Sequence, residues 1–327
     1  MFRIRIRMIF IFALLLALLA VFAACAAKTP EPALPENEPV IDEPVVNEPV
    51  IVETPQNVGN FEFTAHNYPK MAGSLAALPL GQALTAAALS ISREETAQYI
   101  KFEGSTTDNY RGLIYGEFDI LLAYEPSAEA LRLAEENNFT WEMTPIGRDA
   151  LVFIANKDNP LHDLSDAQIR GIYSGAISNW RELGGHDADI IAYQRNKDSG
   201  SQTLFDKLLN LGEALITPPS EKIIGSMIGL LEVVADYDNA IDALGYTVYY
   251  YLTNMEPDKL SRSQIMAVDG VECSNDTIRS GAYPYVNDFY VVIPATLPDD
   301  APARVLYNWI CSEQGRELAE RENYVVL

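Results

Sequence analysis

Hydrophobic and polar positions follow two different periods along the chain from residue 61 onward. The segments 118–123 and 151–155 are apolar almost throughout, which is typical of strands buried on both faces. Between such runs, apolar residues recur at helical spacing, in places behind a serine that can cap a helix. Further strands are expected at residues 189–193, 245–252 and 288–293, and helices at residues 78–89, 94–102, 165–173, 203–210 and 303–321. This alternation predicts an α/β body.

The first 24 residues differ from this pattern and are expected to be a signal peptide. Arg3, Arg5 and Arg7 precede an apolar run over residues 8–24, the order found in secretory signals. The run is short for a spanning helix, which needs about 20 residues. It ends in Ala23-Ala24-Cys25, which resembles a lipobox, and this resemblance implies that Cys25 carries a diacylglycerol anchor. An uncleaved N-terminal membrane anchor is the alternative, and both place the body outside the cytoplasm on a membrane.

Residues 25–60 are rich in Pro, Glu, Val and Asn. A five-residue repeat recurs as Glu38-Pro39-Val40, Glu43-Pro44-Val45 and Glu48-Pro49-Val50. Recurrent proline favours polyproline II at ~3.1 Å per residue, and like charges resist collapse. We therefore expect a disordered tether between the lipid anchor and the body, with a recognition motif for a partner as the alternative.

Composition narrows the possible functions. The 327 residues carry a formal net charge of −23, which argues against nucleic acid as a partner and means that any anion must be held by local donors. Neither GxxxxGK[ST] nor GxGxxG after a strand occurs, so no nucleotide chemistry is expected. There is no CxxC pair, and His66, His162 and His186 are far apart, so no metal and no cofactor are predicted. Spacing leaves open whether Cys273 and Cys311 form a disulfide or remain two buried thiols.

A polar turn over residues 195–203 is the most informative segment for function. It combines hydroxyls, a glycine and backbone N–H groups at the start of a predicted helix, where the helix dipole favours an anion. Arg195 lies four residues before Ser199, and its guanidinium can donate two parallel hydrogen bonds to an oxyanion. Ordinary capping by Ser199 or Ser201, with Arg195 in solvent, explains the same residues equally well.

Two further turns carry hydroxyl groups. Gly73-Ser74-Leu75 opens a predicted helix, and Gly104-Ser105-Thr106-Thr107 follows a strand-like stretch. Each alone is explained by helix capping. In chain order, residues 73–75, 104–107 and 195–203 are the first, second and third turns. Three donor-rich turns, of which only the third has an arginine, would suit a ligand bound mainly by neutral hydrogen bonds.

Several segments resemble the lipid-anchored phosphate-binding proteins of ABC-type phosphate importers. The resemblance extends from about Tyr68 to the C-terminus. It rests on residues 147–159, Ile177-Ser178-Asn179-Trp180 with Gly184-Gly185, and Arg195 with Ser199-Gly200-Ser201-Gln202-Thr203. Gly245-Tyr246 and Gly281-Ala282-Tyr283-Pro284 also look like motifs of this family.

The resemblance implies an α/β, two-lobed periplasmic-binding-protein fold of type II, with two crossover strands and the ligand in the cleft between lobes. Lobe 1 would comprise residues 61–150 and 286–327, and lobe 2 residues 151–285. The positions that match the family's ligand contacts are Ser74, Leu75, Ser105, Thr106, Arg195, Ser199, Gly200 and Ser201.

The sequence departs from the family at one ligand position. The family commonly has an aspartate after the strand that follows the second turn, where it accepts a hydrogen bond from protonated phosphate and so rejects sulfate. Here the strand leads into Tyr124-Glu125-Pro126. Counting back from Pro126 places Tyr124 at this position. Glu125 is the residue that chemistry favours, because its side chain is a carboxylate that can accept a hydrogen bond.

We therefore expect a monomeric solute-binding lipoprotein, rather than an enzyme, that captures inorganic phosphate or a similar oxyanion and delivers it to an ABC transporter permease. It would be extracytoplasmic and anchored to the cell membrane. An anion-sensing or adhesion lipoprotein of the same fold is an alternative. A serine hydrolase or phosphatase using Ser199 or Ser74 is another, but no histidine lies in either motif and GxSxG does not occur.

Overall fold

The computed structural model describes residues 61–237 and 240–327, which belong to one compact unit. The expected signal peptide (1–24), lipidated Cys25 and tether (25–60) lie outside these residues. Within the two described ranges, no helix has both the length and the apolar character needed to cross a membrane.

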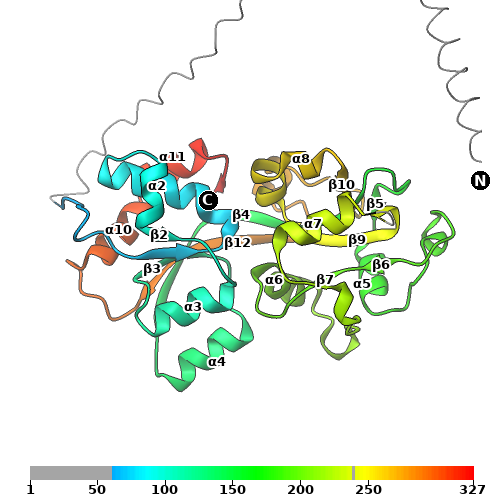
Figure 1. Cartoon of the computed structure of the whole chain (residues 1–327), viewed down its shortest axis with the longest axis horizontal. Coiled ribbons are helices and arrows are strands. Elements are labelled where there is room, and N and C mark those ends of the chain that lie inside the picture. The colour runs from blue at the N-terminus through cyan, green and yellow to red at the C-terminus, as the bar shows by residue number, and fades with distance from the viewer. Residues whose placement is uncertain (1–60, 238–239) are drawn as a thin grey trace, which may run out of the picture. The chain divides into compact units, whose positions relative to one another are not determined.

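One mixed sheet runs through the described part of the chain (Figure 1). Its strand order is β2-β1-β3-β12-β4-β9-β6, and β10 and β13 also pair with β4. The strands are β1 (Met71–Gly73), β2 (Ile100–Lys101), β3 (Ile120–Ala123), β4 (Trp141–Asn156), β6 (Ile191–Ala192), β9 (Ala243–Val248), β10 (Ser263–Ile265), β12 (Val286–Pro294) and β13 (Val325–Val326). Two small parallel sheets pair β5 (Asp163–Leu164) with β11 (Ala267–Val268) and β7 (Gln194–Arg195) with β8 (Ile223–Ile224).

Strand β4 connects the two halves of the main sheet. Its residues 141–150 pair with β12, and residues 151–155 pair with β9, both antiparallel. We call the half built on β1, β2, β3 and β12 lobe 1, and the half built on β6, β9 and β10 lobe 2. Every β4 residue from Ala150 to Ala155 is buried, and successive residues face opposite sides of a sheet, which explains the continuous apolar run here. The lobe boundaries expected after residues 150 and 285 stay a prediction.

Helices surround the sheet in both lobes (Figure 1). Lobe 1 carries α2 (Leu78–Leu89), α3 (Thr106–Ile114), α4 (Ala128–Glu136), α10 (Pro302–Ile310) and α11 (Glu313–Arg321). Lobe 2 carries α5 (Asp166–Tyr173), α6 (Gly200–Leu209), α7 (Met227–Ala235) and α8 (Pro257–Leu260), and α9 (Asn275–Ser280) packs against β4 and β13. Short 3-10 helices are η1 (Leu75–Ala77), η2 (Glu94–Gln98), η3 (Trp180–Leu183), η4 (Gly212–Ala214), η5 (Ser220–Lys222) and η6 (Ala240–Asp242).

The strand predicted over residues 245–252 is wrong at its C-terminal end. Strand β9 ends at Val248, and a π-helix, η7 (Tyr251–Met255), follows. The Tyr250 N–H donates to Asp149 Oδ1 at 3.0 Å, and the Tyr250 ring stacks on Tyr324 with centroids 3.8 Å apart. These contacts with residues distant in sequence stabilise the turn that ends the strand.

Two predicted helices also differ from the structure. Residues 94–102 form η2 and then β2, because Ile100 pairs with Met71 at the sheet edge and extends the backbone there. Residues 303–321 form α10 and α11 rather than one helix. The break occurs where Ser312 Oγ accepts a hydrogen bond from the Gly315 N–H at 3.4 Å and caps α11. The helix predicted over residues 78–89 is confirmed as α2.

Candidate functional site

Arg195 is a buried cation in lobe 2. It is the last residue of strand β7 and is 8% exposed. Nε donates to Ile224 O at 3.0 Å, Nη2 donates to Gly225 O at 3.3 Å, and Nη1 is 3.4 Å from Ser201 Oγ. A guanidinium has five N–H groups, so these contacts leave donors available. Among the described residues, no carboxylate pairs with Arg195, and a buried charge without a counter-ion is costly unless a ligand supplies one.

The backbone around Arg195 is held by two polar side chains. The Arg195 N–H donates to Tyr246 Oη at 2.9 Å and to Gln202 Oε1 at 3.1 Å. Burial lowers the pKa of Arg195 to about 10, which leaves the guanidinium charged at neutral pH. The cation is therefore both fixed in place and protonated.

The start of α6 supplies donors beside this cation. Ser199 is its N-cap, with extended backbone, and its Oγ accepts a hydrogen bond from the Gln202 N–H at 3.1 Å. The first backbone N–H groups of a helix have no partner within the helix, and they lie at its positive end. Those of Gly200 and Ser201 are such groups. Ser199 and Ser201 are themselves buried, with their hydroxyl oxygens 3.5 Å apart.

The first turn contributes a hydroxyl that lacks a partner. Ser74 Oγ is buried and forms no hydrogen bond with any described residue, although the Ser74 N–H donates to Leu122 O at 2.9 Å. Leu75 begins η1 directly after it, and the Leu75 side chain is exposed. A buried hydroxyl without a hydrogen-bond partner lowers the stability of the folded protein, so a ligand that bonds to Ser74 Oγ would remove this cost.

In the second turn, Thr106 and Ser105 have different surroundings. Ser105 caps α3 in a capping box with Asp108, and its Oγ is 2.7 Å from Asp108 Oδ2. Thr106 is buried and lies against Gly200 of lobe 2, where an added Cβ would be 2.4 Å from Thr106 Oγ1. The Ser105 hydroxyl is therefore already engaged, and Thr106 is the residue of this pair that meets the third turn.

Several hydrogen bonds connect the three turns. Asn109 Nδ2 of α3 donates to Gly73 O at 2.8 Å, which ties the second turn to the first. The Thr107 N–H and Thr107 Oγ1 both donate to Asp198 O at 3.3 Å, which ties the second turn to the third. Because Asp198 belongs to lobe 2 and Thr107 to lobe 1, these last bonds also join the lobes.

Tyr124 and Glu125, the two alternatives left open for the acceptor position, have different partners. Tyr124 follows β3 and is buried; its Oη donates to Asp149 Oδ2 at 2.6 Å. Its ring carbon Cδ2 would be 3.8 Å from a Cβ at Gly200. Glu125 instead pairs with Lys207 of lobe 2 and accepts a hydrogen bond from Tyr290 Oη at 3.2 Å.

Asp149 is a buried carboxylate that the sequence reasoning missed. It lies in β4, where its Oδ1 accepts hydrogen bonds from the N–H groups of Ala150 at 2.8 Å and Tyr250 at 3.0 Å. Burial raises the pKa of Asp149 to about 6, against the opposing effect of these donors. A charged residue at the start of the apolar run 150–155 was the available signal.

The other candidate chemical groups lie elsewhere. His186 Nε2 is 2.6 Å from Asp242 Oδ1, and His162 Nδ1 contacts Gln264 Oε1. Cys273 and Cys311 are free thiols. Within residues 61–237 and 240–327, no group of three or more His, Cys, Asp or Glu side chains is placed to hold a metal ion.

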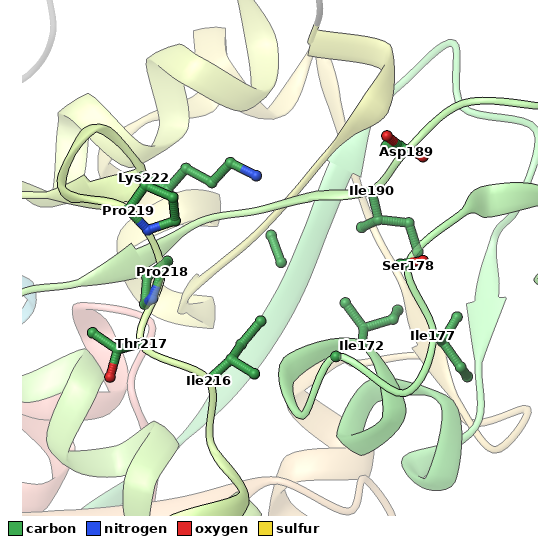
Figure 2. Close-up of a pocket in the computed structure, with 12 residues that line it drawn as sticks. Ile172, Ile177, Ser178, Asp189, Ile190, Ile216, Thr217, Pro218, Pro219 and Lys222 are labelled. Atoms are coloured by element: carbon green, nitrogen blue, oxygen red, sulfur yellow. The ribbon is translucent and has the colours of Figure 1, made fainter.

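A separate, largely apolar pocket lies in lobe 2 (Figure 2). Its volume is about 330 Å³, and Ile172, Ile177, Ile190, Ile216, Pro218 and Lys222 are among its lining residues. None of the eight residues expected to contact the ligand lines it. The donors described above are therefore not part of this pocket.

Comparison with known proteins gives a family match over most of the chain. Residues 68–314 match the PBP superfamily domain. The chain is 29% identical over 170 residues to the phosphate-binding protein PstS of Bacillus subtilis, which covers 52% of this chain and 50% of the relative. It is 24% identical over 188 residues to PstS of Borreliella burgdorferi, which covers 56% of this chain and 64% of the relative. The chain thus matches between half and two thirds of the length of these relatives.

Solved structures share the fold. A substrate-binding protein from Clostridium perfringens, crystallised with bound phosphate, has a TM-score of 0.62 at 22% identity, covering 79% of this chain and 98% of that chain. An ABC-type phosphate transport receptor from Vibrio cholerae has a TM-score of 0.57 at 19% identity, covering 81% of this chain and 100% of that chain. These matches confirm the two-lobed periplasmic-binding-protein fold expected from the sequence. The chain belongs to the PBP superfamily, and within it resembles the PstS phosphate-binding proteins.

Proposed function

We propose that this protein captures inorganic phosphate between its two lobes. The buried, unpaired guanidinium of Arg195 is the observation that carries the proposal, because it lies beside the start of α6 and has no carboxylate among the described residues to neutralise it. The phosphate-binding relatives support phosphate over other oxyanions.

The ligand would take hydrogen bonds from all three turns. Arg195 supplies the positive charge, the N–H groups of Leu75, Gly200 and Ser201 supply backbone donors, and Ser74, Thr106, Ser199 and Ser201 supply hydroxyls. Ser105 completes the expected set, but its hydroxyl would first have to leave Asp108. Neutral donors and one guanidinium allow a strongly acidic protein to hold an anion without a broadly positive surface.

The contacts between the lobes suit a capture mechanism. The bonds from Thr107 to Asp198 and the ion pair of Lys207 with Glu125 exist only when the lobes are close together. An anion that takes bonds from both lobes favours this closed form, and capture follows as a shift of population towards it.

The cellular role follows from the same proposal. The closed, loaded form would be recognised by an ABC transporter permease. The protein would be a monomer outside the cytoplasm, tethered to the membrane through a lipid on Cys25. No bond in the ligand is broken, so the protein would not be an enzyme.

An anion-sensing or adhesion role would use the same site, and the gene neighbourhood discriminates between these roles. Adjacent permease and ATPase genes favour transport, and an adjacent kinase gene favours sensing. Hydrolysis by Ser199 or Ser74 needs a general base, whereas His186 and His162 bond to Asp242 and Gln264 instead.

Titration calorimetry of the purified protein with phosphate, sulfate and molybdate tests the proposal. We expect phosphate binding, and a loss of affinity of roughly 30-fold or more in Arg195→Ala, since the variant removes one partner of a buried charged contact. Arg181→Ala is the matched control, because Arg181 is exposed and pairs with Asp187 away from the three turns. Failure of the wild type to bind any of the three anions, or an unchanged affinity in Arg195→Ala, would contradict the proposal.

A further inference from the structure

Gln202 joins the start of α6 to Arg195. Its backbone N–H donates to Ser199 Oγ at 3.1 Å, and its side-chain Oε1 accepts from the Arg195 N–H at 3.1 Å. The residue is 4% exposed and lies in the first turn of α6, directly after Gly200 and Ser201. One side chain therefore links the cation to the helix start whose N–H groups are the expected backbone donors.

Asp206, one turn further along α6, fixes which end of the Gln202 amide faces Arg195. Its Oδ1 accepts a hydrogen bond from Gln202 Nε2 at 2.8 Å. A carboxylate can only accept and a backbone N–H can only donate, so opposite kinds of group bind the two ends of the amide. In the flipped amide, Oε1 would face the carboxylate and Nε2 would face the Arg195 N–H, and both contacts would be repulsive. Asp206 itself is exposed, so its effect on Arg195 would pass through Gln202.

Tyr246 of β9 completes this hydrogen-bond network. Its Oη accepts from the Arg195 N–H at 2.9 Å and donates its own proton to Gln202 Oε1. The Tyr246 ring is 1% exposed and stacks on Phe205 of α6 with centroids 4.5 Å apart. The network thus has one arrangement of protons, from the Arg195 N–H to the Asp206 carboxylate. A buried polar network in which every member has a partner is rigid.

The network fixes a different property of Arg195 from the contacts of its side chain. The carbonyl groups of Ile224 and Gly225 accept from the guanidinium and set its direction. Gln202 instead sets the place of the Arg195 backbone relative to α6. An oxyanion that bonds to both the guanidinium and the first N–H groups of α6 needs the two at a fixed spacing. Donors held at that spacing before binding increase affinity, because less ordering is required when the ligand arrives.

We propose that Gln202, oriented by Asp206, is a positioning residue that holds Arg195 in place relative to the start of α6, so that both bind one anion. This inference rests on the proposed capture of an oxyanion. An exposed carboxylate one turn along the helix then contributes to affinity through Gln202.

Gln202→Met and Asp206→Leu test this role by titration calorimetry of the whole protein with phosphate. Gln202→Met keeps the length of the side chain and removes the acceptor, so phosphate affinity should fall roughly 5- to 20-fold. In Asp206→Leu the Gln202 amide is free to flip, and affinity should fall roughly three- to tenfold. Asp206→Asn should lose less than Asp206→Leu, because its Oδ1 can still accept from Gln202 Nε2.

Gln168→Met is the matched control for the loss of a buried glutamine bond. Gln168 lies in α5 of the same lobe, and its Oε1 accepts from the Ser165 N–H at 2.8 Å in a capping box. The control variant therefore loses a similar hydrogen bond away from Arg195. It should keep the wild-type phosphate affinity even where its free energy of unfolding is lower.

A double-mutant cycle separates positioning of Arg195 from a general structural role. If Gln202 acts through Arg195, Gln202→Met should lower affinity much less in the Arg195→Ala background than in the wild type. A purely structural role gives the same fold-loss in both backgrounds.

The outcomes also separate this inference from the proposed function. Phosphate binding by the wild type, with either unchanged affinity in Gln202→Met or equal fold-losses in the two backgrounds, overturns the positioning role and leaves capture standing. If the wild type binds no phosphate, the proposed function is wrong and this inference falls with it. Should Gln202→Met fail to fold, Asp206→Leu decides, because it changes an exposed residue: lowered affinity supports the role, and wild-type affinity overturns it.

Discussion

Gly200→Ala introduces a methyl group at the contact between the lobes. An ideal Cβ at Gly200 would be 2.4 Å from Thr106 Oγ1, 3.5 Å from Thr106 Cβ and 3.8 Å from Tyr124 Cδ2. The first distance is far inside van der Waals contact, and Thr106 is only 4% exposed, so its side chain has little room to move away. The new methyl group therefore clashes with Thr106 and should separate α6 from the start of α3.

The magnitude follows from the cost of overpacking, which is about 1–3 kcal/mol. Thr106 and Gly200 belong to different lobes, so the cost falls on the closed form alone. If phosphate binds the closed form, apparent affinity falls by the same free energy, which is roughly 5- to 150-fold. The free energy of unfolding of the ligand-free protein should change little, because an alanine at the start of a helix is well tolerated when the lobes are open.

Two measurements check this separation of affinity from stability. Calorimetry gives the phosphate affinity, and small-angle X-ray scattering gives the radius of gyration with and without phosphate, which should decrease in the wild type and less in Gly200→Ala. Gly225→Ala is the matched control, because an added Cβ there meets no atom within 4 Å and the substitution keeps the carbonyl oxygen that accepts from Arg195. Wild-type affinity and wild-type compaction in Gly200→Ala would refute the view that this contact forms on closure.

Ser74→Ala should raise the free energy of unfolding of the ligand-free protein by about 1 kcal/mol, since it removes a buried hydroxyl without a partner, and should weaken phosphate binding; a loss of stability in urea denaturation would contradict this. Lys207→Met should weaken phosphate binding roughly two- to fivefold, because the partly exposed ion pair with Glu125 joins the lobes and such pairs contribute about 0.2–1 kcal/mol. Calorimetry measures this effect, and an unchanged affinity would mean that the pair does not contribute to closure. Burial raises the pKa of Asp149 from 3.8 to about 6, so the folded state binds its proton more tightly, and this stabilisation is complete below pH 3.8 and is lost as the pH rises through about 6. The loss should approach about 3 kcal/mol; denaturation between pH 4 and 7 should show it in the wild type and not in Asp149→Asn, and equal pH dependence in both would contradict it.

The candidate site was predictable where its features are local. A serine before a helix, the first N–H groups of that helix and a nearby arginine are properties of a few consecutive residues, so the turn at 195–203 could be identified from its sequence. The sequence could not decide between Tyr124 and Glu125 for the acceptor position, because the partners of both residues are distant in sequence. In the folded protein Tyr124 bonds to Asp149 and Glu125 pairs with Lys207.

The sequence by itself determined the apolar runs of the buried strands, the helix starts and the three donor-rich turns, since each follows from the chemistry of residues within a few positions of one another. The tertiary structure alone decided the contacts between distant segments. Asp149 meets Tyr124 across 25 residues and Tyr250 across 101, and Lys207 meets Glu125 across 82. The contact of Tyr250 with Asp149 also helped to end β9 at Val248. Local sequence cannot specify such pairings, because their energy exists only once the sheet has brought both lobes together.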